Sequence, residues 1–359
     1  MPTLRGRVRA DRGPLLLVAL VLALGALLAC VIPAAVERAA DDAMHAAVAR
    51  AGDSAELVAT VPFPPAQDND VRQRVPGSAA LTDATFRNTR LLLPPALAGV
   101  LRTPIARVTT EPLGVLGHGT GRSLVLAYVT ASTGDPSVLW TSGRAPHATV
   151  PAGERNLVRK RASGPSTVEV GLAEPAARAL GVRAGTRLEA LDARREEVHV
   201  LVTGLYRAGD PRDPVWSAVP HLLEPAGFSD DAGHGYLAVT ALLSRESLPD
   251  ARIAMDEDLV TRQVVYPADP ARVGTGNADA VAAGVVRLQA SSPEALPDDV
   301  RWATNLQAVL RQGQRQVAAA QGQAAALLAG LVTAAALVTA LAADLLVRRR
   351  AGALALARV

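Results

Sequence analysis

The longest run of carboxylates in the chain is Asp256, Glu257 and Asp258, and these side chains are the first candidates for chemistry. Divalent cations such as Ca²⁺ and Mg²⁺ prefer oxygen ligands, so adjacent carboxylates could bind one. The same run is also typical of a solvated surface turn. We favour the solvated turn, because consecutive carboxylates on a surface usually bind no ion.

Two other patterns were candidates for a site. The glycine-rich stretch from Gly117 to Gly121 lacks the lysine and the spacing of a phosphate-binding loop, and a hairpin turn explains it. The histidines show no metal-binding spacing; they are His45, His118, His147, His199, His221 and His234. The chain also lacks a Gly-x-Ser-x-Gly nucleophile motif. We therefore predict no catalytic, cofactor-binding or metal-binding residue, and interpret the chain as non-enzymatic.

The charge pattern argues against nucleic acid as a partner. Aromatic residues make up 3% of the chain, the net charge is +3, and of the 37 basic residues only Lys160 is a lysine. A nucleic-acid surface would need a basic run with interleaved aromatics. The basic stretch from Arg155 to Arg161 could meet anionic lipid or an envelope polymer, but a solvated loop explains it better.

The stretch from Ala324 to Val347 predicts a membrane-spanning helix. It has about the ~20 apolar residues that cross ~30 Å of hydrocarbon. Its one charge, Asp344, precedes Arg348 by four residues, so the two can pair along one helix face. A proton or substrate relay is the alternative role for an ionisable residue inside a membrane.

Residues 13–35 form a second uncharged stretch. Arginines precede it at positions 5, 7, 9 and 12. Under the positive-inside rule these arginines, and Arg348 to Arg350 after the later stretch, lie in the cytoplasm. A cleaved secretory signal, or a lipoprotein signal cleaved before Cys30, is the alternative for residues 13–35. Because Cys30 is the only cysteine, the remainder of the chain has no disulfide.

The fold class expected from these stretches is an α+β membrane protein with two transmembrane helices flanking a large extracytoplasmic α+β domain. Residues 36–323 would lie outside a bacterial plasma membrane, with both termini in the cytoplasm. The expected segments are a tail (1–12), a span (13–35), a stalk helix (36–52), the α+β domain (53–299), a second stalk helix (300–323), a second span (324–347) and a cytoplasmic end (348–359).

Local patterns predict several elements inside this domain. Residues 174–180 read as a short helix capped by Gly181. Residues 187–191 and 198–206 read as a β-hairpin, because apolar and polar residues alternate in the second strand. From about residue 300 onward one helix could run to residue 350, roughly 75 Å at about 1.5 Å per residue. A break at Gly313 or Gly322 is the alternative.

The region from Gly143 to Tyr206 resembles a known family. It contains Gly-Arg-x-Pro at 143–146, the strand and helix VEVGLAEPAARALGV at 168–182, a turn at Gly185 and the strand VHVLVTGLY at 198–206. This order is similar to the extracytoplasmic domain of FtsX/MacB-type ABC transporter permeases. The turn lacks the acidic residue usual in that family. The family also has at least two further spans after the point where this chain ends, so the chain looks like the N-terminal half.

The resemblance implies a membrane (permease) subunit of an ABC transporter or of an ABC-type mechanotransmission system. Its implied partners are a cytoplasmic ABC ATPase, a second permease half or homodimer partner, and the lipid bilayer. The residues implied to contact the ATPase are Arg348, Arg349, Arg350, Leu354 and Leu356. One alternative is a two-span membrane-anchored sensor or scaffold that binds an envelope ligand without an ATPase. Another is a surface lipoprotein or hydrolase.

Overall fold

The computed structural model describes residues 12–63, 71–117, 121–150, 158–160, 164–229, 235–291 and 300–356. It divides into two compact units. The stalk unit comprises the chain up to Ala51, residues 270–279 and the chain from Ala308 onward. The barrel unit comprises residues 52–269 and 280–307.

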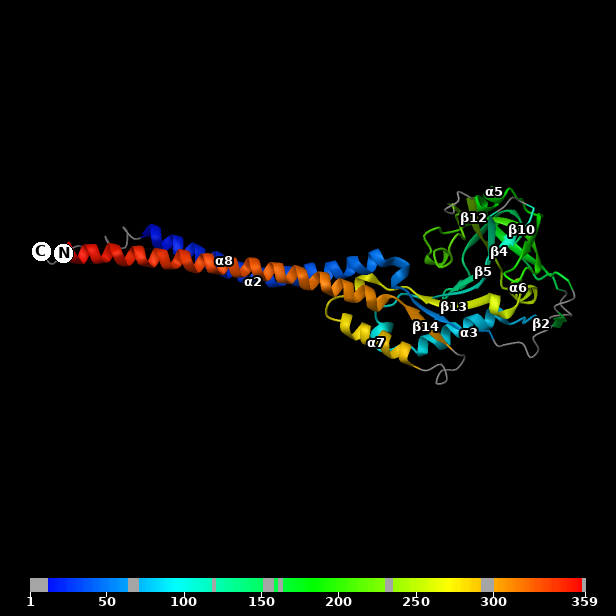
Figure 1. Cartoon of the computed structure of the whole chain (residues 1–359), viewed down its shortest axis with the longest axis horizontal. Coiled ribbons are helices and arrows are strands. Elements are labelled where there is room, and N and C mark those ends of the chain that lie inside the picture. Colours follow the sequence, from blue (N-terminus) through cyan, green and yellow to red (C-terminus); the bar gives the residue numbers. More distant parts are fainter. Residues whose placement is uncertain are drawn as a thin grey trace. The chain divides into compact units, whose positions relative to one another are not determined.

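The centre of the barrel unit is a closed ring of six strands, which Figure 1 shows around the labels β4, β5, β10 and β12. In order around the ring the strands are β5 (Arg122–Ala131), β12 (Gly235–Leu242), β8 (Thr167–Ala173), β10 (Glu197–Ala208), β9 (Arg187–Leu191) and β4 (Leu113–Val115). The ring closes because β12 pairs both with β8 and with β5. The sequence did not predict this closure.

Further strands extend the same sheet away from the ring. From β5 they run in the order β3 (Ile105–Thr110), β13 (Val260–Tyr266), β1 (Leu57–Thr60) and β14 (Arg301–Thr304), and each pairing is antiparallel. Two edge strands, β6 (Val138–Gly143) and β11 (Ala226–Ser229), pair with β10 and β12. A separate small sheet joins β2 (Val71–Gln73) to β7 (Val158–Lys160), and β7 lies in the basic stretch that the sequence favours as a loop.

Alternation of apolar and polar residues builds the barrel core. Along β10 the side chains of Val198, Val200 and Val202 are fully buried, and residues between them face outward or are only partly buried. Across the predicted hairpin, Val200 pairs with Leu188 of β9, which is also buried. The hairpin prediction is therefore confirmed.

Helix α5 (Glu174–Leu180) follows β8 and ends where the sequence predicts. Gly181 adopts the left-handed conformation, with φ at 72°, and its amide donates to carbonyl oxygens of the last helical turn. Glycine fits this position because it has no Cβ to clash there. Outside the two long helices of the stalk unit, the other α-helices in the described residues are α3 (Ser78–Leu91), α4 (Pro95–Ala98), α6 (Leu248–Ala254) and α7 (Ala278–Ala290).

Helix α3 (Ser78–Leu91), which packs on β3 and β13, gives no helical signal in the sequence. Its buried face is built largely from hydroxyl side chains, including Thr82, Thr85 and Thr89. Each of these hydroxyls donates to the carbonyl oxygen four residues earlier, at 2.9 Å. Thr89 also lies 2.8 Å from the hydroxyl of Tyr266 on β13. A buried polar face gives no hydrophobic periodicity, so the usual helix signal was absent.

The stalk unit consists mainly of two long helices that lie side by side, α2 (Arg12–Ala51) and α8 (Leu306–Leu356) (Figure 1). α2 contributes Ala40, Met44 and Val48 to the buried contact. α8 contributes Leu310, Gly313 and Val317. These residues recur at spacings of three, four and seven, as one face of a helix requires. Gly313 allows the close approach, because a Cβ added there would come within 2.8 Å of the Met44 sulfur.

The loop that follows the 3₁₀ turn Pro270–Arg272 docks on α2 through Asp41. The side-chain hydroxyl and the backbone amide of Thr275 donate to one oxygen of Asp41, at 2.7 and 2.8 Å. These hydrogen bonds lower the pKa of Asp41. Gln314 of α8 donates to Asp279 at 2.7 Å, so the same loop region also holds α8.

The expected class, two transmembrane helices flanking an extracytoplasmic α+β domain, is wrong. In the described part of the chain one segment is long and apolar enough to cross a membrane, Leu306–Leu341, and its apolar window is exposed throughout. Residues 13–35 instead begin the 40-residue helix α2, which continues without interruption through the predicted stalk. The domain is a closed six-stranded barrel with extra strands. The two apolar stretches have similar composition, so composition alone predicted a membrane span for each. Composition also carries no information on the order of strands in a sheet.

The long C-terminal helix differs from its prediction at its start. Residues 301–304 pair with β1 as strand β14, so α8 begins at Leu306 instead of near residue 300. From there it runs for 51 residues, and neither Gly313 nor Gly322 breaks it. At about 1.5 Å per residue its length is roughly 75 Å.

Candidate functional site

The acidic run at 256–258 lies against arginines. Asp256 accepts hydrogen bonds from Arg72 of β2, at 2.9 Å, and from Arg194, which also donates to Asp258 at 2.6 Å. Glu257 pairs with Arg252 of α6 at 3.2 Å. Each carboxylate of the run therefore already has a cationic partner. Because the arginines balance the negative charge, a metal ion is not needed to neutralise it. The arginines come from segments far apart in sequence, so spacing did not reveal these pairs.

A second ion pair beside this cluster is fully enclosed. Arg74 donates from Nε to Asp250 at 2.5 Å, and the side chains are 6% and 0% exposed. The other oxygen of Asp250 accepts from the amide and the hydroxyl of Thr149, at 2.5 and 2.8 Å. Arg74 thus links the residue after β2 to α6, and Arg72 links β2 itself to the turn that follows α6. The arrangement is a structural clamp, because all these groups satisfy one another.

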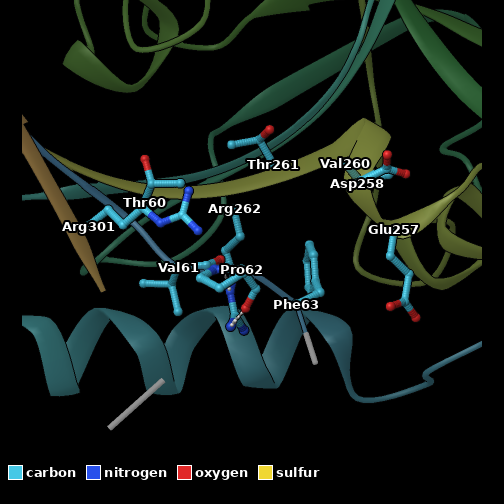
Figure 2. A pocket seen from close by; sticks show the side chains of 10 residues that line it. All are labelled: Thr60, Val61, Pro62, Phe63, Glu257, Asp258, Val260, Thr261, Arg262 and Arg301. Atoms are coloured by element: carbon cyan, nitrogen blue, oxygen red, sulfur yellow. Dashed lines mark hydrogen bonds between the residues drawn. The ribbon is translucent and has the colours of Figure 1, made fainter. Parts of the chain in front are cut away.

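A pocket of about 350 Å³ opens beside β1 and β13 (Figure 2). Figure 2 shows Glu257 and Asp258 on one side and Arg301 on the other. Between them lies Phe63, and the guanidinium carbons of Arg252 and Arg262 are 4.2 and 4.7 Å from its ring centroid. Such cation–π contacts stabilise a buried arginine. The lining mixes apolar side chains such as Val61 and Val260 with charged side chains of both signs, whereas small-molecule pockets carry only a few polar groups.

The Gly-Arg-x-Pro motif has a structural role. Gly143 has φ at 73°, and a Cβ there would lie 2.1 Å from the carbonyl oxygen of Thr203. The guanidinium of Arg144 donates to both oxygens of Glu169 at 2.7 Å. Burial acts to raise the pKa of Glu169, but hydrogen bonds from Arg144 and the His147 amide outweigh it and lower the pKa. The motif therefore holds the neighbouring strands β6, β8 and β10 in place relative to one another.

A group of three possible metal ligands lies on the outer face of the β9–β10 hairpin. It consists of Glu189, Glu197 and His199, whose ligand atoms lie within 4.8 Å of one another. His199 Nε2 is 3.0 Å from Glu197 Oε1. Sequence reasoning missed this group because it tested spacing along the chain. The predicted hairpin was the available signal, since Glu189 and His199 are directly opposed across it.

The residues predicted to contact an ATPase lie in the last part of α8. Arg348 is exposed and pairs with Asp344 at 2.8 Å, as the four-residue spacing predicts. Arg349, Arg350, Leu354 and Leu356 continue the same helix. The predicted basic loop lies partly outside the described residues, as does the centre of the glycine-rich turn at 118–120.

No protein-family model matches the chain, and no curated protein matches it. Function must therefore be inferred from the residues and geometry of this chain.

Proposed function

We propose that the chain is a non-enzymatic membrane subunit of an ABC-type transport or mechanotransmission system in a bacterial plasma membrane. A separate cytoplasmic ATPase would hydrolyse ATP, and the stalk unit would carry the resulting movement. The observation that carries this proposal is the continuity of α8 over 51 residues. One helix includes the candidate membrane-spanning segment, the contact with α2 and the arginine-rich end.

The order of residues along α8 supports this role. Its early turns pack on α2 through Leu310 and Val317, while its later turns expose apolar side chains such as Leu327 and Leu337. A row of exposed leucines along a helix is costly in water and favourable in lipid. The arginines that follow suit the cytoplasmic side of a membrane. A push on the end of α8 would then act on its contact with α2.

The contact between α2 and α8 suits movement along the helix axis. At its closest approach, Gly313 of α8 lies against Met44 and Ala47 of α2. Methionine adapts its shape readily, so the helices can shift without opening a large cavity. A transport path needs more than one span, so the active assembly would contain a second permease half or a second copy of this chain.

The resemblance of residues 143–206 to FtsX/MacB-type permeases supports the choice of an ABC ATPase as partner. A membrane-anchored sensor or scaffold for an envelope ligand is the competing function, and the pocket beside Phe63 is the feature that favours it. The two differ in whether an ATPase binds α8.

Leu354→Asp is expected to abolish co-purification of the proposed ABC ATPase partner. Leucine and alanine favour a helix at 351–356, and Leu354 offers an apolar contact for a groove on the partner. An aspartate would carry a charge into that contact. Membrane insertion should be unchanged, as judged by carbonate extraction.

The matched control is Leu91→Asp, because Leu91 is 84% exposed on α3 of the barrel unit. The proposal requires recovery of the ATPase with wild type and with Leu91→Asp, and its loss with Leu354→Asp. Failure of all three chains to recover the ATPase would favour the sensor or scaffold.

A further inference from the structure

The outer face of the β9–β10 hairpin brings together one imidazole and two carboxylates. His199 and Glu189 are directly opposed across the two strands, and Glu197 lies two residues before His199 on the same face. The ligand atoms of all three lie within 4.8 Å of one another. A tetrahedral zinc with bonds of about 2.0–2.2 Å places its ligand atoms roughly 3.3 Å apart. Glu189 and Glu197 are exposed, so their side chains are free to rotate toward that spacing.

The barrel core fixes the backbone that carries these side chains. Val198 and Val200, on either side of His199, are fully buried. Their cross-strand partners Ala190 and Leu188, on either side of Glu189, are buried as well. Neither strand can slip or rotate without moving these residues out of the core. The three candidate ligands are therefore held on one face before any ion arrives.

Among the described residues, the carboxylates on this face are not paired with arginines, unlike the buried and clustered carboxylates described above. The run at 256–258 and Asp250 are all paired with arginines. In the described part of the chain, no ion pair joins Glu189 or Glu197 to an arginine; Glu197 contacts only His199. Two carboxylates this close repel each other by about 1 kcal/mol in water, and by more where the dielectric is lower. A divalent cation would remove that repulsion.

We propose that Glu189, Glu197 and His199 form a binding site for a divalent transition-metal ion of the Zn²⁺ type. The imidazole favours Zn²⁺ and similar ions over Ca²⁺ and Mg²⁺, which prefer oxygen ligands alone. His199 would bind as a neutral imidazole through Nε2, in place of its contact with Glu197. Three protein ligands leave a coordination position open to water or to a donor from another molecule. The site is independent of the proposed ATPase partner.

The test is isothermal titration of Zn²⁺ into the full chain, purified in detergent with a tag that lacks histidine and then stripped with EDTA. Wild type should bind one Zn²⁺ per chain. His199→Ala and Glu189→Gln should each weaken binding at least about tenfold, because even losing an outer-shell partner costs about 10–100-fold in metal affinity. Mg²⁺ should give no comparable binding.

His147→Ala is the matched control, because the His147 imidazole contacts a single carboxylate, Glu246, at 2.7 Å. It should bind Zn²⁺ like wild type. A thermal unfolding scan of each metal-free variant shows whether the barrel unit is intact, and Zn²⁺ should raise the midpoint of wild type and of His147→Ala alone. Absence of stoichiometric binding by wild type, or equal binding by His199→Ala, would overturn the site.

Discussion

Arg74→Ala is expected to destabilise the barrel unit by about 3–5 kcal/mol. The substitution removes one partner of an ion pair whose side chains are 6% and 0% exposed. Asp250 would keep its hydrogen bonds from Thr149 but would be left as a buried charge with no cation. Urea unfolding followed by tryptophan fluorescence measures the change, because Trp140, Trp216 and Trp302 all lie in the barrel unit.

The control for Arg74→Ala is Arg102→Ala. Arg102 also pairs with an aspartate, Asp269, at 3.2 Å, but its side chain is 56% exposed. An exposed pair contributes about 0–1 kcal/mol. Similar losses of stability for the two variants would contradict the interpretation of the Arg74–Asp250 pair as a buried clamp.

The second large effect is expected for Gly143→Ala, which should cost roughly 2–6 kcal/mol. Part of the cost is conformational, because φ is 73° at this position. The rest is steric, since the new Cβ would lie 2.1 Å from the carbonyl oxygen of Thr203 and 2.9 Å from the Cβ of Ala184. Backbone atoms cannot move aside as the end of a flexible side chain can. The same urea titration measures the loss.

Gly185→Ala separates these two contributions. Gly185 has φ at 90° but has no atom within 4 Å of an added Cβ. Only the conformational strain of about 1–3 kcal/mol should appear there. If Gly143→Ala were no more destabilising than Gly185→Ala, the steric account of the Gly-Arg-x-Pro motif would be wrong.

Elements specified by local signals could be predicted from the sequence. The bounds of α5 and β9 agree with their predictions, because Gly181 ends one and alternating apolar residues define the other. The pairing of Asp344 with Arg348 was predictable for the same reason, since both lie on one helix face. Each of these features depends on residues within a few positions of one another.

Features that depend on distant segments could not be predicted. The ring closes where β12 pairs with β5, whose sequence lies more than a hundred residues earlier, and no local pattern encodes that choice. The partners of Asp256 likewise come from Arg72 and Arg194. The number of spans was wrong because an apolar stretch in a long helix has the composition of a membrane segment. Glu189 and His199 became neighbours only through the register of a hairpin.

The central claim is that the stalk unit carries movement from an ATPase, and a distance measurement between α2 and α8 tests it most directly. Spin labels at Ala46→Cys on α2 and Ala319→Cys on α8 occupy exposed positions, and Cys30→Ala removes the only native cysteine. A control pair at Arg311→Cys and Ala319→Cys lies on α8 alone. In the complex with the ATPase, ATP should shift the distance distribution of the first pair and leave the control pair unchanged. An unchanged first pair during ATP hydrolysis would contradict the account.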